Sequence, residues 1–315
     1  MTTTKKLNSN AFRELILVGV VLILCVIWSL LSPNFLTMSN ITNILRQSSF
    51  IVVAAVGMTM VIIIGEIDLS AGSLLAVSGL IGAMVVRQTD SIALAISAAI
   101  LVGAFVGFLN GVMCAKGKLP GFIATLAMMV ILRGLAFIIT GGNSVVWQNR
   151  TFTSIGTGFV GPIPIPVIVM LVAIVFGVFV TTKLRFGRYI YSVGGNAEAS
   201  RWSGIVVDNV KIYVFTIMGI LTAIAGLIVT ARLGSGQPSA GSGFELDAIT
   251  AVVVGGTSLS GGKGKVTGTV VGVLLLTVLT NGMTLVGINT HWQQVFKGLI
   301  IIVSVFVESR NKKMA

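Results

Sequence analysis

The stretch KLRFGRYIYSVGGNAEASRWSGIVVDNVK, residues 183–211, is a hydrophilic island in a chain that is otherwise mostly apolar. It holds five of the 21 Lys and Arg residues of the protein. Within it, GGNAEASRWSG predicts a short helix that Asn196 caps, that carries Glu198 in its first turn and that ends at Gly204. Because a helix of roughly two turns is not stable alone in water, we expect something else to hold it.

The composition indicates an all-α integral membrane protein. Of the 315 residues, 55% are hydrophobic and 10% are charged, with a mean hydropathy of +1.03, whereas soluble domains carry roughly 25% charged residues. A single soluble core cannot bury that much apolar surface. The net charge of +12 does not indicate nucleic-acid binding, because the charges are spread among loops. We expect one transmembrane domain over residues 1–315, since no composition shift marks a second.

Apolar runs of about 17–22 residues predict the transmembrane spans. Ten such spans lie at residues 14–32, 50–66, 70–86, 92–115, 121–140, 165–182, 212–231, 246–260, 266–286 and 292–307. Only residues 66–69 separate the second span from the third, and the eighth is short and glycine-rich. At these two places a full crossing and a broken or re-entrant helix both stay open. The first run lacks an A-x-A-like exit, which favours an uncleaved span over a signal peptide.

The distribution of Lys and Arg predicts how these spans are oriented. With the N-terminus in the cytoplasm, segments 1–13, 116–120, 183–211, 261–265 and 308–315 hold 15 of the 21 basic residues. The outer segments hold four, namely Arg46, Arg87, Arg150 and Arg232. We therefore expect both termini on the cytoplasmic side. The longest outer loop, residues 141–166, offers Trp147 and Arg150 as contact residues.

Small residues indicate how the spans pack. Gly103, Gly107 and Gly111 form a four-residue ladder, and Gly268 and Gly272 repeat its spacing. Such ladders serve either helix packing within a chain or a contact between two copies. A faint internal repeat aligns GEIDLSAGS (65–73) with GGTSLSGGK (255–263). Duplication and chance similarity are both open for this pair; in transporters, parallel repeats place the pathway between the halves.

The motifs of enzyme chemistry are missing from the sequence. SLSGGKGKV (258–266) lacks the leading Gly of a nucleotide-binding loop and the Ser or Thr after its Lys, and no GxSxG, HExxH or CxxC occurs. Cys25 and Cys114 lie in apolar runs and His291 is the only histidine, so neither a disulfide framework nor a histidine metal site is expected. We expect no enzymatic activity, no metal and no cofactor in this chain.

Ionisable residues at membrane depth are the stronger signal, because such charges are costly there. They are Glu66, Asp68, Arg133, Glu245, Asp247 and Lys297. Their opposite signs fit structural ion pairs, for example of Arg133 or Lys297 with an acid, and they also fit a hydrophilic pathway. A third reading is that Glu66 and Asp68 are simply hydrated at a cytoplasmic turn. The polar run GSGQPSAGSG (234–243) is a candidate lining of an outer vestibule.

Three long motifs carry a family resemblance. GMTMVIIIGEIDLSAGSL (57–74), YIYSVGGNAEASRWSGI (189–205) and FELDAITAVVVGGTSLSGGKG (244–264) occur in this order. They resemble the permease subunits of bacterial ABC importers for ribose and other monosaccharides, and the resemblance covers almost the whole chain. Two positions depart from that pattern: Glu66 stands where a small residue is expected, and Trp202 stands where an aliphatic residue is expected.

The resemblance implies a set of partners. It implies a homodimer of permeases in the cytoplasmic membrane, a periplasmic sugar-binding protein, and a cytoplasmic ATPase, commonly with tandem cassettes, that binds ATP and Mg²⁺. Carried onto this sequence, it implies that a coupling helix docks in a cleft of the ATPase. The residues of that segment are Gly194, Gly195, Asn196, Glu198, Ala199, Ser200, Arg201, Trp202, Ser203 and Gly204.

The leading hypothesis is therefore the membrane subunit of an ATP-driven importer for ribose or a similar monosaccharide. The residues we expect along the sugar pathway are Asp68, Ser70, Asn143, Glu245, Asp247 and Thr257. One alternative is an autonomous ion-coupled sugar carrier, although few carboxylates lie deep in the spans and this hypothesis leaves the 194–204 segment without a role. Another alternative is a membrane receptor or scaffold, which would dock partners without moving any solute.

Overall fold

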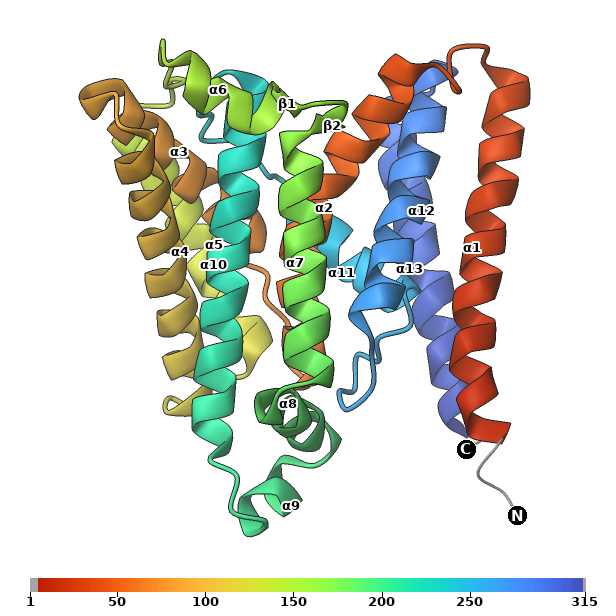
Figure 1. Ribbon diagram of the computed structural model, residues 1–315. Helices are drawn as coiled ribbons and strands as arrows, with labels where there is room; N and C mark the ends of the chain where they lie inside the picture. The colour runs from red at the N-terminus through yellow and green to blue at the C-terminus, as the bar shows by residue number, and fades with distance from the viewer. Residues whose placement is uncertain (1–4, 314–315) are drawn as a thin grey trace.

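The computed structural model describes residues 5–313, with side chains described over residues 15–304 and at Phe306. The chain is helical almost throughout (Figure 1), which confirms the all-α class. The helices are α1 (Lys5–Leu31), α2 (Met38–Ile63), α3 (Ala71–Thr89), α4 (Ile92–Ala115), α5 (Gly121–Thr140), α6 (Arg150–Thr157), α7 (Ile165–Thr182), α8 (Arg185–Gly195), α9 (Ala197–Trp202), α10 (Val207–Leu233), α11 (Phe244–Val254), α12 (Val266–Leu285) and α13 (Thr290–Lys313). The strands β1 (Phe159–Val160) and β2 (Ile163–Pro164) form a small antiparallel hairpin.

Seven helices in the described part of the chain are long and apolar enough to cross a membrane, namely α2, α3, α4, α5, α7, α10 and α12. The apolar part of α1, Leu15–Leu31, is shorter. The predicted spans 92–115, 121–140 and 165–182 coincide with α4, α5 and α7. Each of these runs is bounded by Ser, Pro, Gly or Lys, and Arg133 is the one charged residue within them, so the local sequence indicates where they begin and end.

The two ends of the bundle agree with the predicted orientation. Both termini, α8 and α9 lie at one end, here called the inner end, and α6 with the β-hairpin lies at the other, the outer end (Figure 1). At the outer end, Arg46 donates to the carbonyl of Thr157 at 2.5 Å and lies over the Phe159 ring. The basic side chains that we counted at the chain ends, at positions 5, 6, 13, 310, 312 and 313, lie outside the described side chains.

Two predicted spans are wrong in their bounds. The second, 50–66, begins too late, because α2 starts at Met38 behind an N-cap in which Thr37 Oγ1 accepts from Asn40 N. The eighth, 246–260, is not a continuous crossing. Helix α11 has 11 residues, about 16 Å at 1.5 Å per residue, against a hydrocarbon core of about 30 Å. A non-helical segment, residues 234–243, brings the chain down to α11 from the outer end.

Helix α2 lies at the centre of the bundle and is buried over residues 51–64 without interruption. That stretch is apolar on every side, which is the pattern of a helix enclosed by other helices. Helices α7, α10 and α12 pack around it. The inner end of α2, at Ile63, contributes to the functional region described below.

The glycine ladders are packing surfaces within the chain. A Cβ atom on Gly103, Gly107 or Gly111 of α4 would overlap the backbone of α10. A Cβ atom on Gly268 or Gly272 of α12 would overlap the backbone of α11. Of the two interpretations left open by the sequence, packing within one chain is the one that the structure supports. In lipid no hydrophobic driving force brings helices together. Close packing of two backbones, which glycine permits, holds them instead.

The two segments of the proposed repeat lie side by side at the inner ends of their helices. Loop 64–70 follows α2 and precedes α3, and loop 255–265 follows α11 and precedes α12. The backbone N–H of Gly262 donates to the carbonyl of Ile63 at 2.8 Å, which joins the two loops directly. This arrangement fits two related units; an origin by duplication stays a prediction.

The outer loop is folded more tightly than the sequence indicated. Trp147 was predicted as a contact residue, but it is 7% exposed. Its Nε1 donates to Thr153 Oγ1 at 3.0 Å, and its ring meets Phe152 edge to face at 4.9 Å. This prediction is wrong because α6 folds back over the indole. Arg150 is exposed, as a contact residue requires.

Candidate functional site

The short helix predicted in the hydrophilic island is confirmed. Asn196 Oδ1 accepts from the backbone N of Ala199 at 2.9 Å and caps α9. Glu198 lies in the first turn, where its charge complements the helix dipole. Gly204 follows the helix at φ +83°, a conformation that glycine adopts without strain.

The sequence analysis missed α8, which precedes α9 in the same island. Its buried residues are Gly187, Ile190 and Val193, three residues apart. That spacing is the signal of an amphipathic helix, and the arginines and glycines of the segment 185–195 obscured it. Helix α8 holds α9: Ser200 is 1% exposed and its hydroxyl shares a 2.8 Å hydrogen bond with the hydroxyl of Ser192. The short helix therefore rests on its own chain along one face.

The opposite face of α9 is open. Trp202 is 89% exposed, and Glu198 and Arg201 are also exposed. Arg201 forms a 3.3 Å ion pair with Asp208, in which both side chains are about half exposed. A large aromatic side chain standing free in this way is typical of a surface that a partner covers. Of the predicted coupling residues, Ser200 faces α8, whereas Glu198, Arg201 and Trp202 face outward.

Helix α8 also contacts both inner loops. The Tyr191 hydroxyl donates to the carbonyl of Gly264 at 2.8 Å. Burial raises the pKa of the Tyr191 phenol, so it remains a donor at neutral pH. Gly194 lies so close to the carbonyl of Ile63 and to Gly262 that no Cβ atom fits. The exposed helix α9 is thus connected through α8 to loops 64–70 and 255–265.

Glu66 is a structural residue of the inner end. It forms an ion pair with Lys211 of α10, and its Oε2 accepts from the backbone N of Gly121 at 3.0 Å. The carboxylate therefore joins the beginning of α5 to the beginning of α10. The side chains of Glu66 and Lys211 are 14% and 20% exposed, so the hydrated interpretation of Glu66 is wrong. This contact gives a physical reason for an acid where the resemblance led us to expect a small residue.

Asp68 lies in a buried polar cluster with Ser70 and Asn110. Asp68 is 1% exposed, and its Oδ1 accepts from the backbone N and the hydroxyl of Ser70 at 2.8 and 2.6 Å. The Asn110 amide donates to the Ser70 hydroxyl at 2.9 Å. The hydrated interpretation of Asp68 is therefore wrong as well. Asn110 was missed; as the one amide in the apolar run 92–115, it carried a signal.

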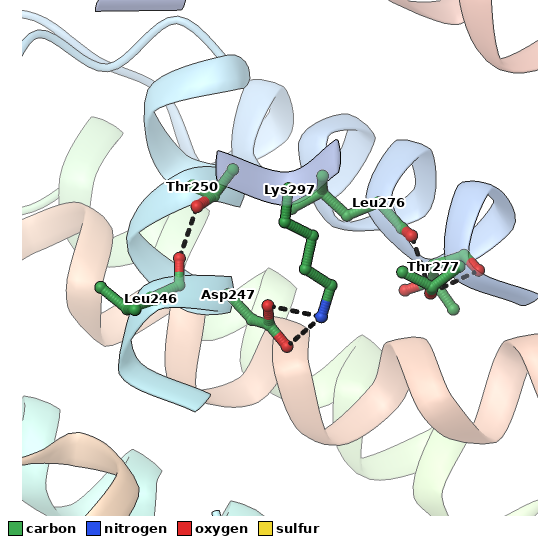
Figure 2. Close-up of polar contacts among 7 residues, drawn as sticks. Leu246, Asp247, Thr250, Leu276, Thr277 and Lys297 are labelled. Atoms are coloured by element: carbon green, nitrogen blue, oxygen red, sulfur yellow. Dashed lines mark hydrogen bonds and ion pairs between the residues drawn. The ribbon is translucent and has the colours of Figure 1, made fainter. Parts of the chain in front are cut away.

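Asp247 and Lys297 form an ion pair at membrane depth, which was one of the arrangements expected for these charges. Lys297 Nζ donates to the two carboxylate oxygens of Asp247 at 2.7 and 2.9 Å. Figure 2 shows the lysine of α13 reaching down to the carboxylate on α11. The two side chains are 28% and 27% exposed. A charged pair that remains partly exposed at this depth does not suit contact with lipid alone.

Arg133 holds the non-helical segment 234–243. Its Nη1 donates to the carbonyls of Pro238 at 2.7 Å and Ala240 at 2.8 Å. Backbone that is not helical needs such partners within a membrane, because lipid offers none. Arg133 of α5 therefore holds segment 234–243 in place. The segment does more than line an outer vestibule, the role that the sequence had suggested. Glu245 follows it in the first turn of α11, where its Oε2 lies against Gly72 of α3.

The residues predicted along the pathway do not all meet. Asp68 and Ser70 lie together at the inner end, and Glu245 and Asp247 lie together on α11. Asn143 is exposed in the loop after α5 at the outer end, and Thr257 is 1% exposed in loop 255–265. Among the described residues no group of three or more His, Cys, Asp and Glu side chains could hold a metal ion.

Comparisons with known proteins place the chain in a family. Residues 40–305 match the family described as the permease component of branched-chain amino acid transport systems. The ribose import permease protein of Haemophilus influenzae is 46% identical over 292 residues, which cover 91% of this chain and 90% of that protein. The ribose import permease protein of Bacillus subtilis is 44% identical, with coverage of 92% and 90%.

A third relative, the L-arabinose ABC transporter permease protein of Azospirillum brasilense, is 36% identical, with coverage of 94% and 89%. No solved structure matches the chain. These relatives are named as permeases, which are transport components rather than enzymes. With seven apolar helices in its described part, the chain is a multi-pass protein of the cytoplasmic membrane. The match over residues 40–305 and the identities with these relatives show that the chain belongs to the family of transport-system permease components.

Proposed function

We propose that this chain is the membrane subunit of an ATP-driven importer that carries ribose or a similar monosaccharide. The observation that carries the proposal is the capped helix α9, held on α8 with its other face and Trp202 exposed. A permease whose sequence has no nucleotide-binding loop needs an ATPase in another subunit. The exposed face of α9 is a suitable docking element for such a subunit. The ribose and arabinose permeases named above support a pentose as the substrate.

The partners follow from this role. The segment from Gly194 to Gly204 enters a cleft of the ATPase, which carries ATP and Mg²⁺ and has tandem cassettes. This chain itself binds no cofactor and no metal. Two copies of the permease form one pathway, and a periplasmic binding protein delivers the sugar to the outer end. Sugar selectivity lies mainly in that binding protein, because a tight site within the membrane would slow release.

The pathway runs along the polar groups at membrane depth. Glu245, Asp247 and Lys297 are all partly exposed there. Charges at this depth are expensive beside lipid and acceptable beside water. We assign these three residues to the polar wall of the pathway, and we place the buried Asp68 and Ser70 behind that wall, nearer the inner end. Asn143 then lies at its outer entrance and Thr257 at its inner exit.

Reconstitution tests the proposal against an ion-coupled carrier, which the relatives named above do not support. In proteoliposomes, radiolabelled ribose should accumulate only when the permease, the ATPase, the binding protein and ATP are all present. The permease alone should give no uphill uptake under a proton or sodium gradient. Gradient-driven accumulation by the permease alone would overturn the proposal. Docking of partners with no sugar flux under any condition would favour the receptor or scaffold instead.

The role of α9 in coupling leads to a separate prediction. Replacing Glu198 and Arg201 together by alanine should lower ribose uptake at least about tenfold, because two charged contacts with the ATPase are lost. Membrane insertion should be unchanged, since both side chains are exposed. The measurements are ATP hydrolysis and uptake by the same preparation, with Arg87→Gln at the far end of the bundle as a control. Uptake at the native level in the double variant would refute the coupling role.

A further inference from the structure

Arg133 has hydrogen-bonding capacity that the protein does not use. It lies about 18 Å along α5 from the start of that helix, near the middle of the membrane. One of its nitrogens, Nη1, makes both hydrogen bonds to the carbonyls of Pro238 and Ala240. Within the described residues its Nε and Nη2 have no protein partner, and neither of them is among the fully buried unpaired atoms. The free side of the guanidinium therefore faces accessible space.

Glu245 presents a carboxylate to the same region. The side chain is partly exposed and lies against Gly72 of α3, where a Cβ atom would overlap Oε2. Arg133 binds the carbonyl of Ala240, and the next carbonyl, that of Gly241, lies against Gly72 beside Glu245 Oε2, so the two charged groups flank the same stretch of backbone. Among the described residues, however, the two do not form an ion pair within 4.0 Å, as Asp247 and Lys297 do. The carboxylate and the guanidinium thus lie on either side of backbone residues 240–241 without closing on each other.

Two opposite charges in a medium of low dielectric constant attract strongly, so a gap between them needs a cause. Here the fold holds them apart, because Arg133 is held by the two carbonyls and Glu245 is placed by the start of α11 against Gly72. A group that fills the gap must accept from the guanidinium and donate to the carboxylate. A hydroxyl group does both at once.

The charges also select the kind of ligand. An anion such as a sugar phosphate is repelled by Glu245, and a cation is repelled by Arg133. A neutral molecule with neighbouring hydroxyl groups satisfies both residues and adds no net charge at membrane depth. Because the Arg133 and Glu245 side chains are partly exposed, each of their interactions with a ligand is weak. A site along a transport route requires this, since the ligand must leave it again.

We propose that Arg133 and Glu245 form a weak binding site for the hydroxyl groups of a neutral sugar, halfway along the route through the membrane. The site rests on the proposed function and adds a residue, Arg133, to its pathway. Arg133 has two tasks there. Through Nη1 it positions segment 234–243, and through Nε and Nη2 it meets the sugar.

Ligand-observed NMR tests this site separately from transport. Saturation-transfer spectra of millimolar ribose are recorded with the importer, permease and ATPase together, in lipid nanodiscs without binding protein. The native importer should give ribose signals, and ribose 5-phosphate should not reduce them. Glu245→Gln keeps the size of the side chain and removes its charge, and it should weaken ribose binding about tenfold. Arg133→Lys keeps a cation for the two carbonyls and should weaken binding to a similar degree.

The control is Arg87→Gln, a change of the same kind at an exposed position at the outer end of α3, which should leave the ribose signals unchanged. Equal ribose signals from Glu245→Gln and native importer would overturn the site, as would effective competition by ribose 5-phosphate. Uptake of ribose by an importer that shows no ribose signal would also overturn it, and the proposed function would stand. An importer that carries no pentose at all would instead contradict the proposed function.

Discussion

Replacing Gly107 by leucine is expected to prevent the permease from folding. Gly107 lies where α4 crosses α10, and even a Cβ atom there would overlap the carbonyl oxygen of Phe215. The obstacle is backbone rather than a flexible side chain, so the two helices must move apart. The same ladder places Gly103 and Gly111 against α10, and all three contacts would open together. We expect a loss of about 3 kcal/mol or more, at or beyond the upper end for overpacked sites.

The measurement is the yield of monodisperse protein by size-exclusion chromatography, followed by ribose uptake in the reconstituted importer. The chain offers a matched control in Gly134 of α5, where nothing lies within 4 Å of a Cβ atom. Gly134→Leu should give normal yield and normal uptake. A fully folded and active Gly107→Leu protein would show that the α4–α10 contact is not as close as described here.

Replacing Lys297 by methionine is expected to destabilise the protein and to reduce uptake. Methionine has a similar length and no charge, so the Asp247 carboxylate would lose its cation at membrane depth (Figure 2). Removal of one partner from a buried pair costs about 3–5 kcal/mol. Because both side chains are about a quarter exposed, water can solvate the remaining charge, and we expect about 2 kcal/mol instead.

The double variant Asp247→Asn with Lys297→Met separates stability from transport. It removes the lone charge, so most of the lost stability should return, as a double-mutant cycle would record. Uptake should stay reduced if the pair belongs to the polar wall of the pathway. Thermal unfolding in detergent and ribose uptake are the two measurements. A single variant with native stability would show that the pair contributes nothing to the fold.

Local patterns in the sequence predicted the features that depend on a few neighbouring residues. The bounds of α4, α5 and α7 followed from continuous apolar runs, and helix α9 followed from the capping residue Asn196. The Lys and Arg of the loops predicted which elements share an end of the bundle (Figure 1). Each of these features depends on the free energy of a short segment in water or lipid. The residues of the segment itself set that free energy.

The missed features depend on contacts between distant segments. The interruption at segment 234–243 is stable because Arg133, more than a hundred positions earlier in the chain, satisfies two of its carbonyls. The acid at Glu66 is explained by Lys211 near the start of α10 and by the backbone N of Gly121 at the start of α5. None of these partners can be inferred from spacing along the chain.

The sequence by itself determined a multi-pass helical membrane protein with a capped helix at its inner end, because hydropathy, charge and capping act over short distances. That it is a permease followed from the resemblance carried by its three long motifs. Only the tertiary structure decided which polar groups meet. It joined Asp247 to Lys297, held Arg133 on two carbonyls and Glu245 against Gly72, and connected α9 through α8 to the end of α2 and to loop 255–265. The physical reason is that a charge or an unpaired carbonyl at membrane depth must find its partner inside the fold, and the fold alone brings that partner near.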